Sequence, residues 1–348
     1  MSFLTTLSNS CTLQSSLFCA QKPNPLSLRT SILPTQVGNK IVYQPLRRNN
    51  KVFSPNRCVG KIEASLKWEK GYKNVEVFSK EHLAVSLAYD VAQLSTKFTK
   101  ERGAFTVALS GGSLIKYLRK LVDSPYAETI DWSKWHVFWV DERVVPKDNL
   151  ESNYKLANDG FLSKVPIPPL NVYSIDDSLP PDGAADVYET TLRRLVTSNV
   201  IATSIANSPS QSDVYETTLR RLVTSNVIAT STNGLPKFDL MLLGMGPDGH
   251  VASLFPGHPL LNEDQKWVSF LNDSPKQPPE RITFTFPVIN ASSNVAMVVT
   301  GAGKSTAVYT ALEDDVKTVQ LPIEKVSPYE GELKWYLDKG AASKLFKE

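Results

Sequence analysis

The feature of this sequence that most constrains its fold is a set of short apolar segments, each followed directly by glycines or charged residues. Four such segments of four to six residues are predicted to be buried strands: residues 105–109, 137–140, 238–243 and 295–299. Helical periodicity appears before, between and after them, in residues 79–98, 114–121 and 305–312. Strands that alternate with helices predict an α/β fold with a mostly parallel sheet.

The residues that could bind a ligand or transfer a proton follow directly after these strands. The clusters are Ser110-Gly111-Gly112-Ser113, Asp141-Glu142-Arg143, Gly244 to His250, and Gly301-Ala302-Gly303-Lys304. In parallel sheets, ligands bind outside the carboxyl ends of the strands. The four clusters are therefore predicted to build one site.

The first 60 residues differ in composition from the rest of the chain. They hold seven Lys or Arg, no Asp or Glu, and all three cysteines. A Ser-rich, basic, acid-free leader is typical of an organelle transit peptide. We expect residues 1–60 to be a disordered transit peptide, cleaved near residues 58–66, that directs the protein to the chloroplast stroma. The alternative is an ordinary disordered tail.

The body, residues 61–348, is expected to be a single catalytic domain. Its formal charge is 3 − 7 = −4, which gives no electrostatic reason to expect a nucleic acid or an anionic membrane as partner. It contains no cysteine, which excludes disulfides, thiolate zinc sites and a cysteine nucleophile there, and no apolar run long enough to span a membrane. The oligomeric state is left open, with a monomer as the expectation.

A perfect repeat interrupts the body. Residues 186–204 (DVYETTLRRLVTSNVIATS) recur unchanged as residues 213–231, 27 positions later. Two identical copies indicate a recent duplication or a gene-model error rather than a solenoid, which needs more copies. Each copy predicts one amphipathic helix, with Val187, Leu192, Leu195 and Val196 on one side in the first. Because a single-copy fold has one groove for this helix, we expect the other copy to be a surface excursion; a new binding helix is the less favoured alternative.

The loop from Gly244 to His250 is the best candidate for proton transfer. Three glycines make a tight turn that presents His250 and Asp248. An imidazole accepts a proton near neutral pH, and a carboxylate two residues away can orient it. The other histidines, His82, His136 and His258, are expected to be structural, the last because it has no acid beside it in the sequence. The alternative for His250 is that it merely ties the loop together.

The remaining clusters offer groups that bind anions. Gly111 and Gly112 let the backbone approach a phosphate at a helix start, and Ser113 is also a candidate helix cap; the alternative is a plain turn. Arg143, fixed by Asp141 or Glu142, is predicted to hold a phosphate or carboxylate, unless the triplet is a surface ion pair. Further candidate cations are Lys304 and Arg281. Gly303-Lys304-Ser305 is not a Walker loop, because Val298 stands where that loop needs glycine.

These groups together predict a small phosphorylated substrate handled by acid–base chemistry. No His-x-x-x-His or Glu-x-x-His spacing occurs, so no metal site and no cofactor are expected.

Several motifs resemble those of the 6-phosphogluconolactonases, a family related to the glucosamine-6-phosphate and galactosamine-6-phosphate isomerases. The resemblance covers about residues 70 to 340. Its motifs occur in the family's order: residues 108–113 (ALSGGS), 139–143 (WVDER), 152–154 (SNY), 244–257 (GMGPDGHVASLFPG), 281–283 (RIT) and 301–304 (GAGK). With its leader, the chain looks like a plant plastid form.

The resemblance implies a Rossmann-like, three-layer α/β sandwich with a mostly parallel sheet. It also implies hydrolysis of 6-phosphogluconolactone to 6-phosphogluconate in the oxidative pentose phosphate pathway. It implies that His250 is the general base, oriented by Asp248, and that Arg143 and Lys304 bind the phosphate or stabilise developing charge. The implied sugar-phosphate site also contains Ser110, Gly111, Gly112, Ser113, Asp141, Gly246 and Arg281. Neither a covalent nucleophile nor a cofactor is required, because a lactone is already activated.

Two rival functions are weighed against this one. Glucosamine-6-phosphate deaminases share the Asp-Gly-His loop but continue it with Asn-Glu-Pro, whose Glu joins the proton relay. Here the triplet is Leu254-Phe255-Pro256, and a phenylalanine cannot transfer protons. A catalytically silent sugar-phosphate-binding protein is the second rival, and the intact Asp248, His250, Arg143 and Lys304 argue against it.

Overall fold

A seven-stranded sheet with six parallel strands organises the fold. The computed structural model describes residues 66–70, 73–197, 227–313 and 320–345. The strand order is β1-β2-β12-β11-β8-β3-β4, and β1 alone runs antiparallel, against β2. The strands are β1 (Leu66–Lys70), β2 (Lys73–Phe78), β3 (Phe105–Leu109), β4 (Trp135–Trp139), β8 (Leu240–Leu243), β11 (Asn294–Val299) and β12 (Glu332–Asp338).

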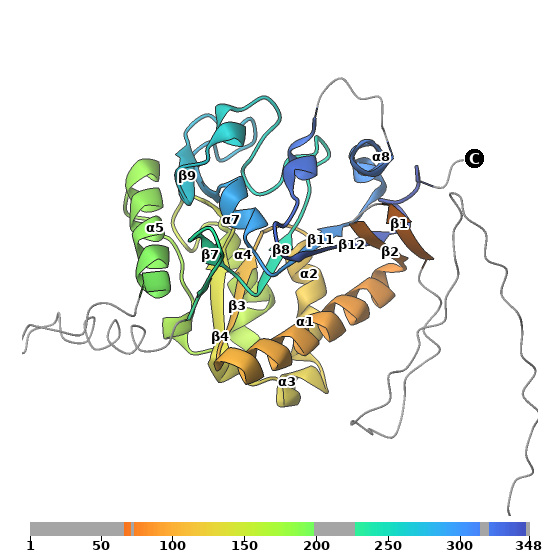
Figure 1. Ribbon diagram of the computed structural model, residues 1–348, viewed down its shortest axis with the longest axis horizontal. Helices are drawn as coiled ribbons and strands as arrows, with labels where there is room; N and C mark the ends of the chain where they lie inside the picture. The colour runs from red at the N-terminus through yellow and green to blue at the C-terminus, as the bar shows by residue number, and fades with distance from the viewer. Residues whose placement is uncertain (1–65, 71–72, 198–226, 314–319, 346–348) are drawn as a thin grey trace, which may run out of the picture. The chain divides into compact units, whose positions relative to one another are not determined.

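Helices cover both faces of this sheet. The α-helices are α1 (Lys80–Arg102), α2 (Leu114–Leu118), α3 (Tyr126–Thr129), α4 (Asn153–Gly160), α5 (Pro181–Thr197), α7 (Phe286–Asn290) and α8 (Ser305–Leu312). In Figure 1, α1, α2 and α3 lie below the sheet, and α7 and α8 lie above it. Short 3₁₀-helices occur at η1 (Arg119–Val122), η2 (Trp132–Lys134), η3 (Leu162–Lys164), η4 (Pro169–Asn171), η5 (Pro259–Asn262), η6 (Ala302–Lys304) and η7 (Pro322–Lys325).

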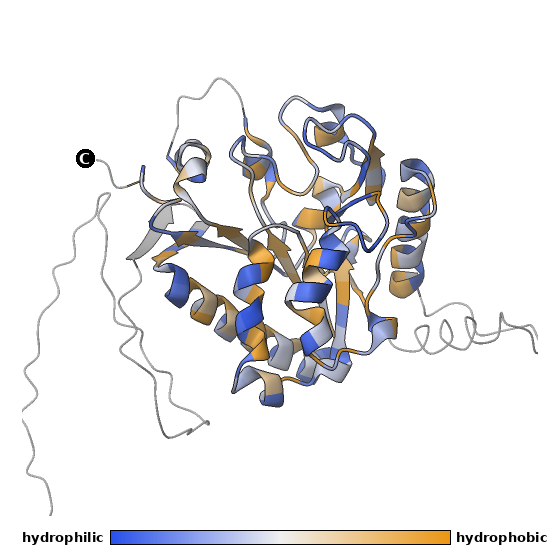
Figure 2. Ribbon diagram, turned by 180° about the vertical axis from the view of Figure 1, so that it is seen from behind, coloured by the Kyte–Doolittle hydropathy of each residue, from blue (hydrophilic) through white to orange (hydrophobic). Residues whose placement is uncertain are grey.

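The side chains of each central strand alternate between two hydrophobic cores. In β4, Trp135, Val137 and Trp139 pack into the core of α1, α2 and α4, whereas Phe138 packs into the core of α5, α7 and α8. This alternation follows from the two-residue period of a strand. Figure 2 shows apolar residues concentrated in the strands and on the sheet-facing sides of the helices. The predicted three-layer α/β sandwich is therefore confirmed.

A smaller antiparallel sheet brings two predicted cations together. It consists of β5 (Asp141–Arg143), β10 (Arg281–Phe284) and β9 (Val268–Leu271). Arg281 stands directly opposite Arg143 in the register of β10 and β5. The sequence predicted Asp141 to Arg143 as the end of the preceding strand; they form a strand of their own instead. A two-residue ladder, β6 (Ala229–Thr230) with β7 (Pro236–Lys237), completes the sheets of the described residues.

The strand order places the four loop clusters side by side. Strands β11, β8, β3 and β4 are consecutive neighbours, so the segments that follow them meet at one edge of the sheet. The chain order reverses between β3 and β8, which makes the gap between them a topological switch point. The Ser110–Ser113 turn and the loop from Gly244 to His250 flank this point.

The two copies of the repeat are used differently. Residues 186–197 of the first copy continue α5, but Val187 is 47% exposed, while Leu192 and Leu195 are buried. The predicted apolar face is thus wrong at Val187, and Tyr188 takes its place in the core. The second copy ends in β6 rather than in helix, because Ala229 and Thr230 pair with β7. Residues 198–226 lie outside the described part of the chain.

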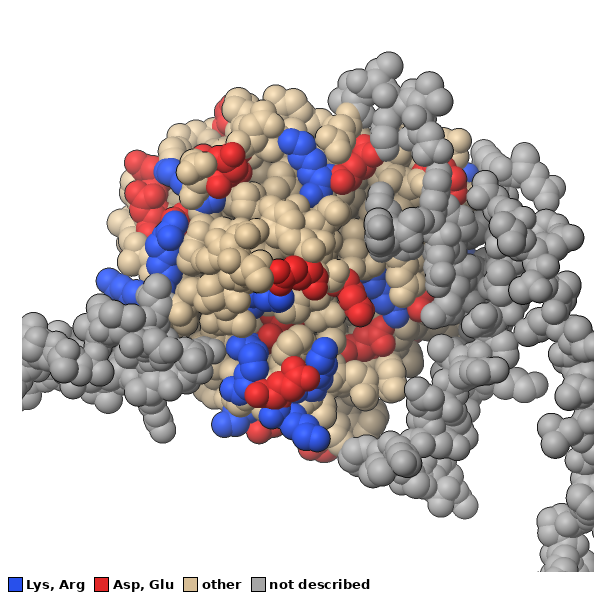
Figure 3. Space-filling model, in the orientation of Figure 1, with Lys and Arg blue, Asp and Glu red and all other residues tan. Residues whose placement is uncertain are grey.

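The predicted transit peptide, residues 1–60, also lies outside the described residues. All described residues fall within one compact unit, Ile41–Glu348. No helix in the described ranges is long and apolar enough to cross a bilayer. On the face of the molecule shown in Figure 3, acidic and basic side chains are interspersed.

Candidate active site

A cavity of about 240 Å³ opens at the carboxyl edge of the sheet. Ten of the eleven predicted site residues line it: Ser110, Gly111, Gly112, Ser113, Asp141, Arg143, Gly246, His250, Arg281 and Lys304. Asp248 does not line the cavity but contacts His250 from behind. The structure thus brings the predicted residues together from all four strand ends.

The loop after β8 fixes the imidazole by backbone hydrogen bonds. The N–H of Gly246 donates to the carbonyl of His250 at 2.9 Å, and the N–H of Gly249 donates to the carbonyl of Gly246 at 3.1 Å. Gly249 has φ +78°, a left-handed conformation that favours glycine. The sequence folds this way because its glycines permit a turn that side chains would obstruct.

Asp248 selects the tautomer of His250. Nδ1 of His250 lies 2.5 Å from Oδ1 of Asp248. A proton on Nδ1 donates to this carboxylate, which leaves Nε2 as the acceptor nitrogen of the ring. Burial raises the pKa of Asp248, but the hydrogen bonds from His250 and Lys276 outweigh burial and bring the pKa below its usual value. The arrangement therefore presents a neutral imidazole with a carboxylate behind it, which is the geometry of a general base.

The environment also keeps the imidazole in its neutral form. Burial is the largest influence on His250 and lowers its pKa, and the positive charge of Lys276 lowers it as well. Asp248 and Asp141 raise the pKa, without restoring its ordinary value. The ring of Phe255 packs against the imidazole with 4.7 Å between centroids. The lowered pKa favours the unprotonated imidazole at neutral pH.

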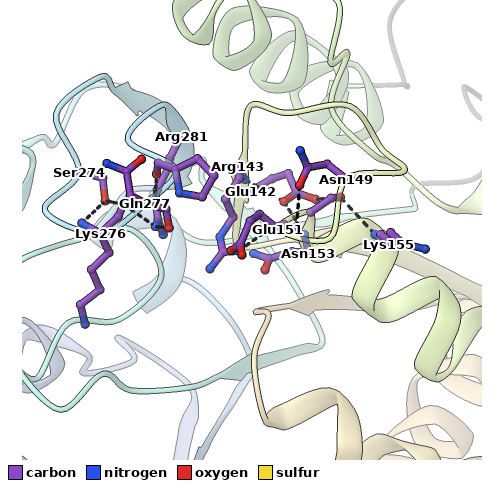
Figure 4. Close-up of polar contacts among 12 residues, drawn as sticks. Glu142, Arg143, Asn149, Glu151, Asn153, Lys155, Ser274, Lys276, Gln277 and Arg281 are labelled. Atoms are coloured by element: carbon purple, nitrogen blue, oxygen red, sulfur yellow. Dashed lines mark hydrogen bonds and ion pairs between the residues drawn. The ribbon is translucent and has the colours of Figure 1, made fainter.

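Arg143 is held by a residue that the sequence analysis missed. The sequence predicted Asp141 or Glu142 as the partner of its guanidinium. Instead, Nη1 of Arg143 donates to the carbonyl of Glu151 and lies 3.5 Å from its carboxylate (Figure 4). Nε of Arg143 is buried without a hydrogen-bond partner among the described residues.

Glu142 caps the N-terminus of α4. Its carboxylate accepts the backbone N–H groups of Asn153 and Tyr154, both at 2.7 Å, and that of Arg143 at 2.8 Å. A carboxylate at a helix N-terminus is favoured by the helix dipole. Burial raises the pKa of Glu142 to about 7, although these three hydrogen bonds oppose the rise. This contact places Asn153, whose Nδ2 donates to the carbonyl of Asp141 at 2.9 Å, on the cavity wall.

Most N–H groups of the Arg281 guanidinium donate to acceptors within the protein. Nε donates to the carbonyl of Pro278, and Nη2 donates to the carbonyls of Lys276 and Gln277. Nη1 lies 3.4 Å from Oγ of Ser253, which in turn donates to Asp141. The guanidinium therefore holds the loop before β10, and Arg281 also lines the cavity.

The turn after β3 is shaped for close approach to a ligand. A Cβ atom on Gly111 would lie 1.9 Å from Oδ1 of Asn153, so only glycine fits there. Oγ of Ser110 is buried and has no hydrogen-bond partner among the described residues. The expectation that Ser113 caps the following helix is wrong, because its side chain makes no capping hydrogen bond. Across the cavity, burial and then the charge of Lys276 lower the pKa of Lys304.

The other histidines take structural places, as predicted, with one difference. His82 contacts Ser79 at the start of α1, and His136 contacts Tyr173. His258 does have an acidic neighbour in space, because its Nε2 lies 3.1 Å from Asp273, but it does not line the cavity. In the described ranges, no group of three or more His, Cys, Asp or Glu side chains is arranged to hold a metal ion.

Lys276 is the main residue of the site that sequence reasoning missed. Its Nζ lies 3.1 Å from Oδ1 of Asp248 and 3.1 Å from Nδ1 of His250. The available signal was weak: a lysine in a proline-rich segment, SPKQPP, 26 residues after the histidine. Such a segment indicates a constrained loop but does not indicate which residues it meets.

Comparisons with known proteins show what this chain is similar to. A family model described as glucosamine-6-phosphate isomerases/6-phosphogluconolactonase matches residues 79–335. The chain is 58% identical over 268 residues to a rice protein (Oryza sativa subsp. indica) named "Probable 6-phosphogluconolactonase 4, chloroplastic", with 77% of this chain and 75% of that protein covered. It is 56% identical over 274 residues to "6-phosphogluconolactonase 3, chloroplastic" of Arabidopsis thaliana, with 78% and 75% covered. The crystal structure of 6-phosphogluconolactonase from Thermotoga maritima superposes with a TM-score of 0.58 at 26% identity, covering 77% of this chain and 100% of that one.

Proposed function

Because this chain belongs to the glucosamine-6-phosphate isomerase/6-phosphogluconolactonase family, we propose that it hydrolyses 6-phosphogluconolactone to 6-phosphogluconate, with His250 as the general base. One observation carries the proposal. The imidazole of His250, oriented by Asp248 at 2.5 Å, lines the same 240 Å³ cavity as Arg143, Arg281 and Lys304. A cavity lined by one base and three cationic side chains suits the attack of water on an anionic substrate.

The reaction needs two proton transfers through one nitrogen. Nε2 of His250 removes a proton from a water molecule as its oxygen attacks the lactone carbonyl carbon. The tetrahedral intermediate then collapses, the bond from this carbon to the ring oxygen breaks, and the imidazolium returns the proton to that oxygen. Asp248 holds the ring through Nδ1 and balances the positive charge of the imidazolium. The product is the open-chain acid, and the base is regenerated.

The cations of the cavity serve the phosphate and the developing oxyanion. Arg143, Lys304 and Arg281 supply positive charge. The Ser110–Ser113 turn offers backbone groups and the hydroxyl of Ser110, which has no hydrogen-bond partner among the described residues. Positive charge placed before the reaction begins stabilises a transition state without reorganisation. The cavity, about 240 Å³, lies just below the range typical of drug-sized ligands, which suits a compact phosphosugar.

Phe255 argues against the deaminase alternative. Its ring is buried and packs on the imidazole of His250, with the guanidinium of Arg281 5.7 Å from its centroid. In the related deaminases, the aligned position is expected to hold a glutamate that relays protons. A phenylalanine here desolvates the base instead, which favours simple water activation.

The location of the reaction follows from the leader and the relatives. Residues 1–60 have the composition of a plastid transit peptide, and the relatives at 58% and 56% identity are named chloroplastic. The proposed reaction therefore belongs to the oxidative pentose phosphate pathway of the plastid stroma.

The test is a coupled assay of the purified full chain on freshly made 6-phosphogluconolactone. Formation of 6-phosphogluconate is followed by its oxidation with an added dehydrogenase, and the spontaneous hydrolysis is subtracted. We expect turnover of the lactone and no ammonia release from glucosamine 6-phosphate. Ammonia release, or a rate equal to the spontaneous one, would contradict the proposed function.

A further inference from the structure

We propose that Lys276 is a positioning residue that keeps the imidazole of His250 in its proton-accepting form. This inference rests on the proposed function, since it concerns the base of that reaction. Nζ of Lys276 lies 3.1 Å from Oδ1 of Asp248 and 3.1 Å from Nδ1 of His250, so the three groups form a closed triangle. Lys276 does not line the cavity, and it acts through its two neighbours.

The hydrogen-bond chemistry of this triangle has one consistent assignment. An ammonium group has donors and no acceptor, and an ionised carboxylate has acceptors and no donor. Both the Nδ1–H of His250 and Nζ of Lys276 therefore donate to Oδ1 of Asp248. The ammonium neutralises part of the negative charge that the imidazole experiences. A second proton on the ring would place two positive charges 3.1 Å apart, which is unfavourable.

The function of such a group follows from the conflict in a histidine–carboxylate pair. The carboxylate fixes the tautomer, but its charge also stabilises the imidazolium, which cannot act as a base. A lysine that contacts both members of the pair preserves the orientation and removes part of the unwanted stabilisation. The base is then available at lower pH than it would be with Asp248 alone.

The backbone of Lys276 is anchored, which separates it from an ordinary surface lysine. Its carbonyl accepts from Oγ of Ser274 at 2.8 Å and from Nη2 of Arg281 at 2.9 Å. Arg281 is 2% exposed and also binds the carbonyls of Gln277 and Pro278. Figure 4 shows the side chain of Lys276 extending from this anchored loop. The arginine thus acts in part by holding the lysine in place.

Other charged groups face the imidazole and stay constant in the test. Asp141 raises the pKa of His250, and Arg143, Arg281 and Lys304 share the cavity wall with it. Phe255 covers one side of the ring. Because these groups come from β5, β10, η6 and the loop after β8, replacing Lys276 alone changes one charge and leaves the rest in place.

The experiment is a titration of His250 by NMR in the full chain, carrying isotope-labelled histidine, for the wild type and Lys276→Met. The resonance is assigned by its loss in His250→Asn. We expect the pKa of His250 to rise by about one unit when the like charge is removed. The apparent pKa of the acid limb in the pH profile of kcat/KM for the lactone should rise by the same amount. Activity should therefore fall several-fold at pH 6 and little at pH 8.5. Lys276→Arg keeps the charge and should restore the wild-type profile.

Controls keep the result interpretable. Lys120 also pairs with an aspartate, Asp123 at 2.9 Å, far along the chain and outside the cavity, so Lys120→Met should leave both profiles unchanged. If Lys276→Met fails to fold, Lys276→Gln replaces it. An unchanged titration of His250 in the folded variant overturns the proposal. Because the titration needs no substrate, a wild type that does not hydrolyse the lactone would refute the proposed function and leave the charge effect measurable.

Discussion

A Cβ atom on Gly246 would lie 2.0 Å from both Cε1 and Nδ1 of His250, and 2.5 Å from Oδ1 of Asp248. Glycine at this position is therefore required by the close approach of the imidazole to the backbone. Gly246→Ala should displace the ring from the carboxylate and reduce kcat by roughly a hundredfold, as misplacement of a reacting group by about 1 Å does. The measurement is the lactone assay, together with the NMR titration of His250.

The matched variant for Gly246 is Gly244→Ala in the same loop. A Cβ atom on Gly244 would meet no heavy atom within 4 Å, and its φ angle is not positive. Because Gly244 also lines the cavity, the added methyl group is expected to act on KM, with a much smaller loss of kcat and an unshifted resonance of His250. Equal losses of kcat in the two variants would contradict this prediction. They would show that glycine is needed for the conformation of the loop and not for the close contact with the imidazole.

Replacing the base itself gives the largest expected effect. His250→Asn keeps a polar group of similar size but cannot accept a proton from water at neutral pH, so kcat/KM should fall by about a hundredfold or more. His258→Asn is the comparison, because His258 also lies beside an aspartate, Asp273 at 3.1 Å, but not on the cavity. We expect less than a threefold change in that variant. Near-normal turnover by His250→Asn would remove His250 from the mechanism.

The elements that the sequence predicts well are those whose signal is local. Strand β3 at Phe105–Leu109 and helix α8 at Ser305–Leu312 match their predicted bounds. Glycines lie close to both ends of the apolar run of β3 and just before the helical period of α8. The four strand ends were predicted to form one site because parallel strands share a carboxyl edge. The cavity contains predicted residues from all four strand ends, whereas Arg281 reaches it from β10 of the smaller sheet, which this rule does not cover.

The residues that sequence reasoning missed are placed by contacts between distant segments. Ser253 donates to Asp141 across 112 positions, and Lys276 reaches His250 across 26. Glu142 was interpreted as a partner of Arg143, since nothing in a charged triplet tells which carboxylate will turn toward a helix N-terminus. The packing of distant segments against one another decides such contacts, and a single sequence does not show it.

Stability should depend on pH through His136, which lies buried in β4 against Tyr173. Burial, and then the charges of Arg102 and Lys134, lower the pKa of His136 from 6.5 to about 4. Between these values, the unfolded chain binds a proton that the folded chain does not, so the free energy of unfolding falls as the pH falls. The loss should reach about 3 kcal/mol at pH 4.

The measurement compares urea unfolding of the wild type and His136→Gln between pH 7 and pH 4.5. A difference between two chains is needed because Glu142, with its pKa raised to about 7, acts in the opposite direction in the same window. We expect the variant to lose less stability than the wild type as the pH falls, by 2 to 3 kcal/mol, a value on the order of that linkage. Parallel profiles would show that His136 is already protonated in the folded chain, or that it is not buried there.

The repeat offers a deletion that leaves every described contact in place. Removing residues 205–231 gives the same amino-acid sequence as removing residues 198–224, because the two copies are identical. In the second description, the deleted residues all lie outside the described part of the chain, while α5 to Thr197 and the ladder of β6 with β7 remain. Leu195 before the deletion and Val227 after it belong to the same hydrophobic core, and the carbonyl of Val227 accepts from Arg102 at 3.2 Å.

We therefore expect the shortened chain to fold, to keep its lactonase activity, and to unfold at the same temperature as the full chain or at a higher one. Thermal unfolding and the coupled assay measure this directly, and loss of the folded state on deletion would mean that both copies are structural.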